Sequence, residues 1–271
     1  MRVQIADSDL SAIKSNLRKA HPALKPSHRI EAASIGLGFN SYAALRAALA
    51  SGPITVEADD KVFSERLNVR YIIDDYTTER ALSRAIGFIE LRRILDEHPE
   101  LTERGFDSAW HGSHDDRRKP FKERLALFNA RRQEAYDSDW GVDQFALAWI
   151  FLSRQRKIKT INRRVGSYGL KHRAERLSRS FDLFRHLGNY VSNGMLIAAA
   201  YAHEFTVKPG DALSYNASFN ISMETLRRAN GWDAKARRTR YFSDDSAGEQ
   251  TVIAAMYGDI PRAFELPRVR T

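Results

Sequence analysis

The sequence predicts a mainly α, multi-helix globular protein with minor β elements. Of its 271 residues, 43% are hydrophobic and 28% are charged, a composition that allows a substantial core and differs from that of disordered chains. From Thr78 onward the apolar residues recur mostly with the helical period. Stretches with the pattern of a β-strand are few and short, so helices should dominate the fold.

Residues 1–50 form a small N-terminal three-helix unit in this prediction. The first helix ends at His21-Pro22, and its buried face carries Leu10, Ile13 and Leu17. Ser27 is the expected N-cap of the second helix, which ends in the turn at 36–38. Ser41 is the expected N-cap of the third helix.

Residues 51–76 are predicted to be a linker or a small β element. Ser51-Gly52-Pro53 interrupts the helical pattern, and the most strand-like stretches of the chain follow at 54–63 and 68–76. The main helical domain is then expected to occupy residues 77–271.

The main domain should contain several helices and one short β hairpin. The polar stretch 106–119 is expected to be an exposed loop, and 207–220 the hairpin. The predicted helices cover 78–97, 120–136, 141–157, 169–187, 193–205, 222–230 and 247–257.

The positive charge is concentrated in residues 154–179. This segment holds ten Lys or Arg residues and a single acid, Glu175, so its excess of nine positive charges equals the formal net charge of +9 of the whole chain. Because binding a polyanion requires clustered cations, the segment is a candidate nucleic-acid interface, whereas a merely solvated helix face would mix both signs.

The predicted helix from Gly169 has two different faces. Leu170, Ala174, Leu177, Phe181 and Phe184 share one stripe, while His172, Arg176 and Arg179 lie opposite, with Lys171 and Arg173 on the flanks. Before this helix, the residues Arg163 to Tyr168 are expected to form a flexible turn that offers guanidinium groups, a hydroxyl and an aromatic ring to phosphates or bases.

Two further patterns are ambiguous. A weaker basic cluster at 227–240 would either extend the same surface or be a charged loop. The helices at 169–187 and 193–205, with Ser192 as an N-cap between them, resemble a helix-turn-helix in outline. Because residues 193–205 are apolar on almost every side, we expect that helix to be buried in the core rather than to read bases.

A hydrolytic site is the alternative from another functional class. His111, His114, Asp115 and Asp116 in WHGSHDD could hold a metal ion, and paired carboxylates occur at 59–60, 74–75 and 244–245. No established catalytic spacing is matched, so a polar loop and ordinary turns are the favoured interpretations.

The compartment predicted from the sequence is the cytoplasm. The chain has no Cys, which excludes disulfide scaffolds and Cys-ligated zinc. It starts without the apolar stretch of a secretory signal, and its longest apolar run, 195–202, is far below the roughly 20 residues that a membrane-spanning helix needs.

Two stretches resemble proteins of bacterial mobile elements. SHRIEAASIGLGFNSYAALRAAL at 27–49 resembles a short N-terminal helical module of proteins carried by plasmids and integrative elements. TINRRVGSYGLKHRAERL at 160–177, followed by NYVSNGMLIAAAYAHEF at 189–205, resembles a second set of proteins from the same elements. The resemblance implies a mobile-element setting and no catalytic residues.

The sequence therefore predicts a nucleic-acid-binding accessory or regulatory protein of a bacterial mobile element, with double-stranded DNA as the favoured partner. We expect no enzyme activity, cofactor, metal or membrane contact, while a homo-oligomer stays open. The alternatives are a metal-dependent nuclease and an interaction factor for an acidic protein. The expected DNA contacts are Arg163, Arg164, Ser167, Tyr168, Lys171, His172, Arg176 and Arg179.

Overall fold

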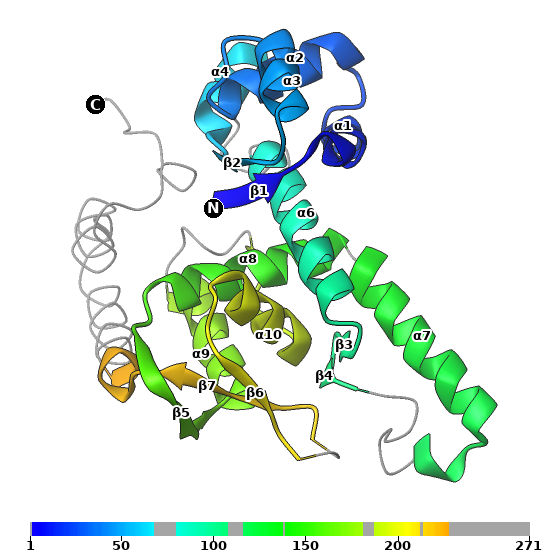
Figure 1. Cartoon of the computed structure of the whole chain (residues 1–271), viewed down its shortest axis with the longest axis vertical. Helices are drawn as coiled ribbons and strands as arrows, with labels where there is room; N and C mark the ends of the chain where they lie inside the picture. Colours follow the sequence, from blue (N-terminus) through cyan, green and yellow to red (C-terminus); the bar gives the residue numbers. More distant parts are fainter. Residues whose placement is uncertain are drawn as a thin grey trace. The chain divides into compact units, whose positions relative to one another are not determined.

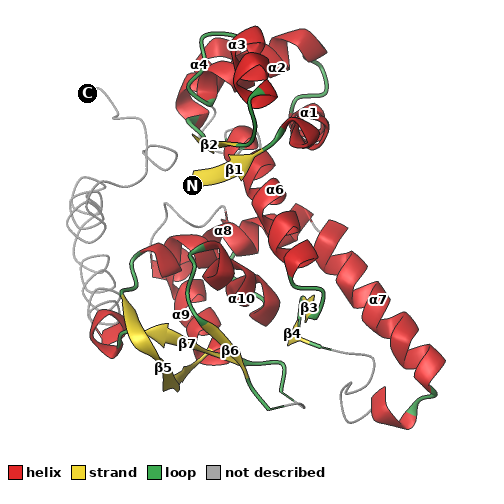
Figure 2. Cartoon of the chain, in the orientation of Figure 1, coloured by secondary structure: helices red, strands yellow, loops and turns green. Residues whose placement is uncertain are grey.

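The fold is mainly α, as the sequence predicts. The structure, a computed structural model, describes residues 2–67, 80–107, 116–137, 139–180, 187–211 and 214–227 (Figure 1). These residues divide into two compact units, one up to Glu90 and one from Leu91 onward. Helices make up most of both units, and the strands form small sheets (Figure 2).

The first unit contains the three expected N-terminal helices and more. Helices α1 (Leu10–Ala20), α2 (Pro26–Gly36) and α3 (Tyr42–Ala50) pack with α4 (Asp60–Leu67) and the start of α6 (Ala81–Glu97). A short antiparallel pair joins β1 (Arg2–Ile5) to β2 (Ile54–Glu57), with Val3 opposite Val56. The unit thus continues well beyond residue 50.

The helix boundaries of this unit agree with the sequence in part. Leu10, Ile13 and Leu17 are buried, and the Ser41 side chain accepts a hydrogen bond from Ala44 N–H as the predicted N-cap of α3. The prediction of Ser27 as an N-cap is wrong, because α2 begins at Pro26 with Lys25 as its N-cap. Proline is well suited to the first position of a helix, since it has no N–H to satisfy there.

The Asp59-Asp60 pair has a structural role. Asp59 Oδ1 accepts a hydrogen bond from Val62 N–H at the start of α4. Asp60 is buried, and its Oδ1 accepts from the N–H groups of Leu82 and Ser83 at the start of α6. Residues 60–63 therefore belong to a helix, which corrects the strand-like interpretation of 54–63 beyond residue 57.

The second unit is built around a buried helix, α10 (Asn193–Ala202). It packs against α8 (Asp139–Ser153) and α9 (Ser167–Ser180), and its residues 193–200 are all buried. This confirms the predicted core helix over residues 193–202 and excludes α10 as a base-reading helix, although the helix ends at Ala202 rather than at the predicted residue 205. The Ser192 side chain accepts a hydrogen bond from Met195 N–H, as expected for the N-cap.

A three-stranded antiparallel sheet lies in the same unit. Its strand order is β5 (Lys157–Gly166), β7 (Ala217–Ile221), β6 (Val207–Pro209), so β7 is central. Strands β6 and β7 form the predicted hairpin within 207–220. Strand β5 was not expected: the helix predicted at 141–157 ends as α8 at Ser153, and the chain then becomes extended.

The remaining elements of the second unit are the end of α6, the two-stranded pair of β3 (Leu101–Thr102) and β4 (Gly105–Phe106), and α7 (Phe121–Asp137). A helical turn starts at Met223, where a helix was expected from 222. The predicted helix at 247–257 lies outside the described residues.

The start of α10 makes very close contacts with the β3–β4 turn. Gly194 N–H donates to Glu103 O at 2.9 Å, and the Asn193 side chain donates to Arg104 O and Tyr215 O. A Cβ atom on Gly194 would lie 1.9 Å from Thr102 O. Only glycine allows this approach of helix and turn.

We predict that Gly194→Ala destabilises the protein by about 3 kcal/mol or more, because neither backbone segment can move without breaking these hydrogen bonds. Gly169→Ala in α9 is the matched control, since a Cβ there has no atom within 4 Å. It should stabilise α9 by about 0.5–1 kcal/mol. Urea unfolding of both variants measures the difference, and equal stabilities would contradict the prediction.

Candidate nucleic-acid interface

Strand β5 carries the first cations of the basic segment. Among the described residues it lies at an edge of its sheet and pairs with β7 alone, with Lys157 opposite Ile221 and Gly166 opposite Ser218. The side chains of Lys159, Arg163 and Arg164 are exposed along it. An edge strand thus displays consecutive cations without burying any of them.

The expected flexible turn at 163–168 is wrong. These residues are the end of β5 and the first turn of α9, and two contacts fix them there. The Asn162 side chain donates to Ile221 O and accepts from Arg164 N–H. The Ser167 hydroxyl accepts from Ala217 N–H at 3.0 Å. The hydrogen bonds with Ile221 and Ala217 tie the segment to β7, so the backbone that carries the arginines is fixed.

Helix α9 has the two faces predicted from its sequence. Leu170, Ala174 and Leu177 are buried, while His172 and Arg179 are exposed and Arg176 is partly exposed. Phe181 and Phe184 lie outside the described residues. The exposed face of α9 therefore continues the row of cations that begins on β5.

Two of the expected contact residues are not on the surface. Ser167 is 0% exposed and Lys171 is 7% exposed. The flank of α9 that carries Lys171 is covered by residues 187–192, which the helical pattern alone could not indicate. Neither residue can reach a phosphate from these positions, so Arg163, Arg164, Tyr168, His172, Arg176 and Arg179 are the candidates that the structure leaves accessible.

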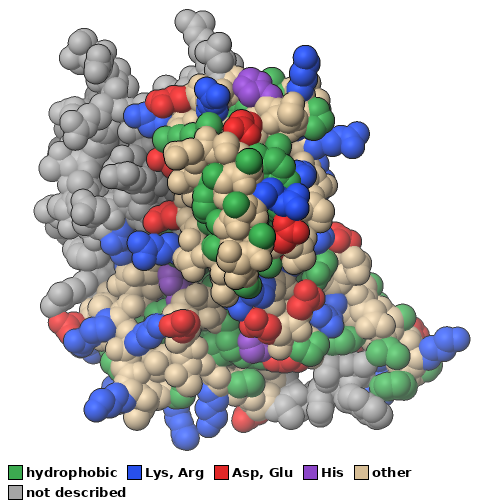
Figure 3. Space-filling model, turned by 45° about the horizontal axis from the view of Figure 1, so that its top comes forward, with side chains coloured by type: hydrophobic (Ala, Val, Ile, Leu, Met, Phe, Trp, Pro, Cys, Tyr) green, Lys and Arg blue, Asp and Glu red, His purple; other side chains and the backbone are tan. Residues whose placement is uncertain are grey.

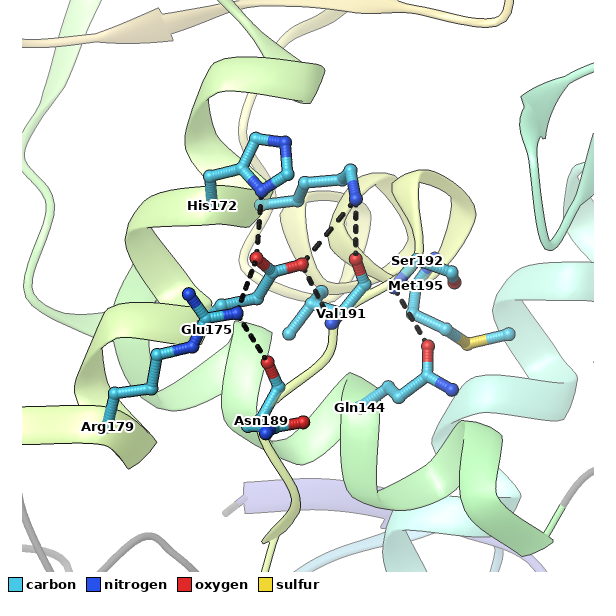
Figure 4. A network of polar contacts seen from close by, with 9 residues as sticks. Gln144, His172, Glu175, Arg179, Asn189, Val191, Ser192 and Met195 are labelled. Carbon is cyan, nitrogen blue, oxygen red and sulfur yellow. Dashed lines mark hydrogen bonds and ion pairs between the residues drawn. The ribbon is translucent and has the colours of Figure 1, made fainter.

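Glu175, the only acid of the basic segment, is a buried centre of polar contacts (Figure 4). Its Oε1 lies 3.5 Å from Lys171 Nζ and accepts a hydrogen bond from Val191 N–H. Its Oε2 accepts from His172 Nδ1 at 2.8 Å and lies 3.6 Å from an Arg179 nitrogen. The carboxylate thus joins α9 to the segment that leads into α10.

Residues 189–192, which lead into α10, are also held by other side chains of α9 and by one of α8. Lys171 Nζ also donates to Val191 O, and Arg179 donates to Asn189 O. On the opposite side, the Gln144 side chain of α8 accepts from Ser192 N–H at 2.8 Å (Figure 4). The connection between α9 and α10 is therefore fixed by side chains of two helices.

The surroundings of Glu175 keep it ionised. Burial alone would raise its pKa, but the hydrogen bonds from His172 and Val191 N–H and the positive charge of Lys171 outweigh burial and lower the pKa. An ionised Glu175 compensates Lys171, which would otherwise be a buried charge without a partner.

Several aromatic rings gather near Lys171. Its Nζ lies 5.2 Å from the ring centroid of Tyr168 and 4.9 Å from that of Tyr190, both within cation–π range. The ring of Trp140 lies 6.4 Å from that of Tyr190, and His172 meets Tyr168 edge to face. Sequence reasoning missed Trp140 and Tyr190, because each lies far along the chain from Tyr168.

The outward cations differ in their neighbours. Arg156 pairs with Glu224, and Lys157 with Glu204. Within the described ranges, Lys159, Arg163 and Arg164 have no carboxylate at ion-pair distance. Lys and Arg side chains project at the lower left of Figure 3, the side of the picture on which Figure 1 has β5, with only a few acidic side chains among them. This part of the surface is strongly positive.

The second basic cluster is described only at its beginning. Arg227 is exposed, and the other cations of 227–240 lie outside the described residues.

The WHGSHDD motif is described only at its last residue. His111, His114 and Asp115 lie outside the described residues, as do the acidic pairs at 74–75 and 244–245. Asp116 is buried, and its Oδ2 lies 2.7 Å from a guanidinium nitrogen of Arg131, which also contacts Asp107. Arg131 thereby joins the two flanks of the motif, and this ion pair is a structural use of Asp116.

Comparisons with protein-family models, with curated proteins and with solved structures found no match. Across the described residues, no helix is both long and apolar enough to cross a lipid bilayer.

We predict that Glu175→Gln destabilises the protein by about 3 kcal/mol, since it leaves the buried Lys171 without its counter-charge. Because the folded-state pKa of Glu175 is lowered, its contribution is present above about pH 4.3 and is lost as the pH falls through the lowered value. The stability difference between wild type and variant should therefore shrink in acid. Thermal unfolding across this pH range measures it.

Glu224→Gln is the matched control for Glu175→Gln. Glu224 pairs with Arg156 at the surface, where both side chains are more than half exposed. An exposed pair of this kind contributes less than about 1 kcal/mol. If both variants lost equal stability, the central role assigned to Glu175 would be wrong.

Proposed function

We propose that this protein binds nucleic acid, with DNA as the favoured partner, through a basic surface formed by β5 and α9. We define the basic surface by its accessible cations Lys159, Arg163, Arg164, Arg176 and Arg179 together with His172. The observation that carries the proposal is the asymmetry of charge: these cations are exposed or partly exposed, whereas the one acid of the segment, Glu175, is buried together with Lys171. Such an excess of exposed positive charge attracts a polyanion.

The dimensions of α9 suit a phosphate backbone. The exposed cationic side of this helix runs from His172 to Arg179, seven residues or about 10 Å at 1.5 Å per residue. Phosphates of one strand of B-DNA recur every 3.4 Å or so along the helix axis, so this length faces about three of them. The arginines at the end of β5 lie next to the start of α9 and extend the contact.

The proposed role is accessory: regulation or maintenance of a bacterial mobile element in the cytoplasm. The resemblance of residues 27–49, 160–177 and 189–205 to proteins of such elements supports it. The helix that resembled a base-reading helix in the sequence, α10, is buried and is not part of the basic surface. Contacts from β5 and α9 to phosphates carry no sequence information, so this surface would bind many sequences similarly.

A different use of the same cations deserves a direct test. Charged residues on an edge strand also prevent edge-to-edge pairing between copies. Under that alternative, neutralising the β5 cations would cause aggregation and leave DNA binding unchanged. An acidic protein partner is a second alternative, because carboxylates would also satisfy the arginines.

We predict that binding to duplex DNA weakens steeply with salt. If about five cations contact phosphates, log K should fall against log salt with a slope of about −4 to −5. The double variant Arg163→Ala with Arg164→Ala should reduce the slope by about 2 and weaken binding to all sequences alike. Fluorescence anisotropy with labelled duplexes of two unrelated sequences gives both quantities.

The control carries the same change of charge in the first unit. Arg2 and Lys61 are exposed there, and Arg2→Ala with Lys61→Ala should leave the slope unchanged. Light scattering of both double variants without DNA tests the edge-protection alternative. A flat salt dependence of the wild type would refute the proposal, and equal competition by polyglutamate would favour the acidic-partner alternative.

A further inference from the structure

An unusual group of exposed aromatic side chains lies beside the basic surface. Trp140 is 59% exposed, Tyr168 58% and Tyr190 42%. We call these three residues the aromatic platform. They come from the start of α8, the first turn of α9 and the segment before α10, so the fold brings them together from distant parts of the chain.

The rings of the platform are held in place rather than free. The ammonium group of Lys171 lies over the rings of both Tyr168 and Tyr190, and Glu175 and Val191 O hold that ammonium group in turn. Trp140 lies close to the backbone at Gly188, where an added Cβ would be 3.5 Å from its Nε1. Lys171 therefore acts as a positioning residue for the rings of Tyr168 and Tyr190.

Packing does not explain this exposure. The buried ammonium group of Lys171 orders the two tyrosine rings, but large parts of the rings remain in contact with water. Exposed aromatic surface costs free energy that burial would recover. Exposed, ordered aromatic rings are the feature on which nucleic-acid bases stack, and stacking accepts every base because each has a π-face.

Cations of the basic surface adjoin the platform at two places along the chain. Tyr168 follows Arg163 and Arg164 by only a few residues along β5 and α9. The Arg179 guanidinium donates to Asn189 O, directly before Tyr190. A strand whose phosphates contact these arginines would have its bases within reach of the rings. This charge complementarity identifies the occupant as a nucleic-acid strand.

We propose that the aromatic platform stacks unpaired bases, so that the protein binds single-stranded or locally opened DNA in preference to intact duplex. This inference rests on the proposed function, because the arginines supply the phosphate contacts. In an intact duplex the bases are stacked on one another and cannot reach a ring at the surface of the protein. Single strands, gaps and frayed ends expose them.

The experiment separates bases from phosphates. The probes are a single-stranded thymidine oligonucleotide of about 12 nucleotides and an abasic strand with the same number of phosphates, each measured against the full chain by anisotropy. We expect the thymidine strand to bind about 5- to 100-fold more tightly than the abasic strand, the range that one stacked base supplies.

The variants locate the preference. Tyr168→Ala should remove most of the preference for thymidine and leave both abasic binding and the salt slope unchanged, whereas Tyr168→Phe keeps the ring and should keep the preference. Phe121→Ala is the control, since Phe121 is also an exposed aromatic, 40% exposed, but lies on α7. Trp140→Ala provides a second variant should Tyr168→Ala disturb folding in a thermal melt.

The outcomes distinguish the two proposals. No salt-dependent binding to any strand refutes the proposed function. Salt-dependent binding with equal affinity for thymidine and abasic strands overturns the stacking inference and leaves the proposed function intact. A preference for thymidine that Tyr168→Ala and Trp140→Ala both retain also overturns the inference, because the bases would then contact another part of the protein.

Discussion

The buried contact between Lys171 and Glu175 organises most of what surrounds it. Taking a lysine and a glutamate out of water costs free energy, which is recovered only when each has several good partners. Here the partners are backbone groups of Val191, a histidine and an arginine, so the pair fixes the segment between α9 and α10 as well as itself. The position of α10, the central helix of its unit, depends on that segment.

The contact between Lys171 and Glu175 also explains how residues 154–179 contribute both to the core and to the basic surface. Glu175 lies on the inner side of α9 and compensates the cations nearest to it, while the arginines of β5 project from an edge strand. An acid on the outer face would have neutralised the surface instead. The geometry of α9 and β5 therefore separates the charges of this segment, which has ten cations and one acid. Lys171 and Glu175 pair in the interior, and the surface keeps a positive excess.

Much of the fold follows from the sequence, but the site follows only in part. Helix α1, with its regular apolar period, helix α10, which is apolar on almost every side, and the β6–β7 hairpin were predictable. Strand β5 was not, because a largely exposed edge strand has no apolar alternation; only its β-branched residues Ile158, Thr160, Ile161 and Val165 hinted at it. The spacing of Lys171 and Glu175 could have indicated a pair. The covering of Lys171 by residues 187–192, and the meeting of Tyr168 with Tyr190, depend on tertiary contacts that no local pattern contains.

The close approach of α10 to the β3–β4 turn has a consequence for recognising relatives of this protein. Gly105 has a φ of +112° and, like Gly194, leaves no space for a Cβ atom, and Asn193 donates to two backbone carbonyls at the same place. A homologous chain can vary its surface cations freely and still fold, but it cannot exchange these residues without rebuilding the centre of the unit. Glycine at 105, Lys-x-x-x-Glu at 171–175 and Ser-Asn-Gly at 192–194 together form a structural signature, one that follows from steric and electrostatic necessity and would persist after overall sequence similarity had faded.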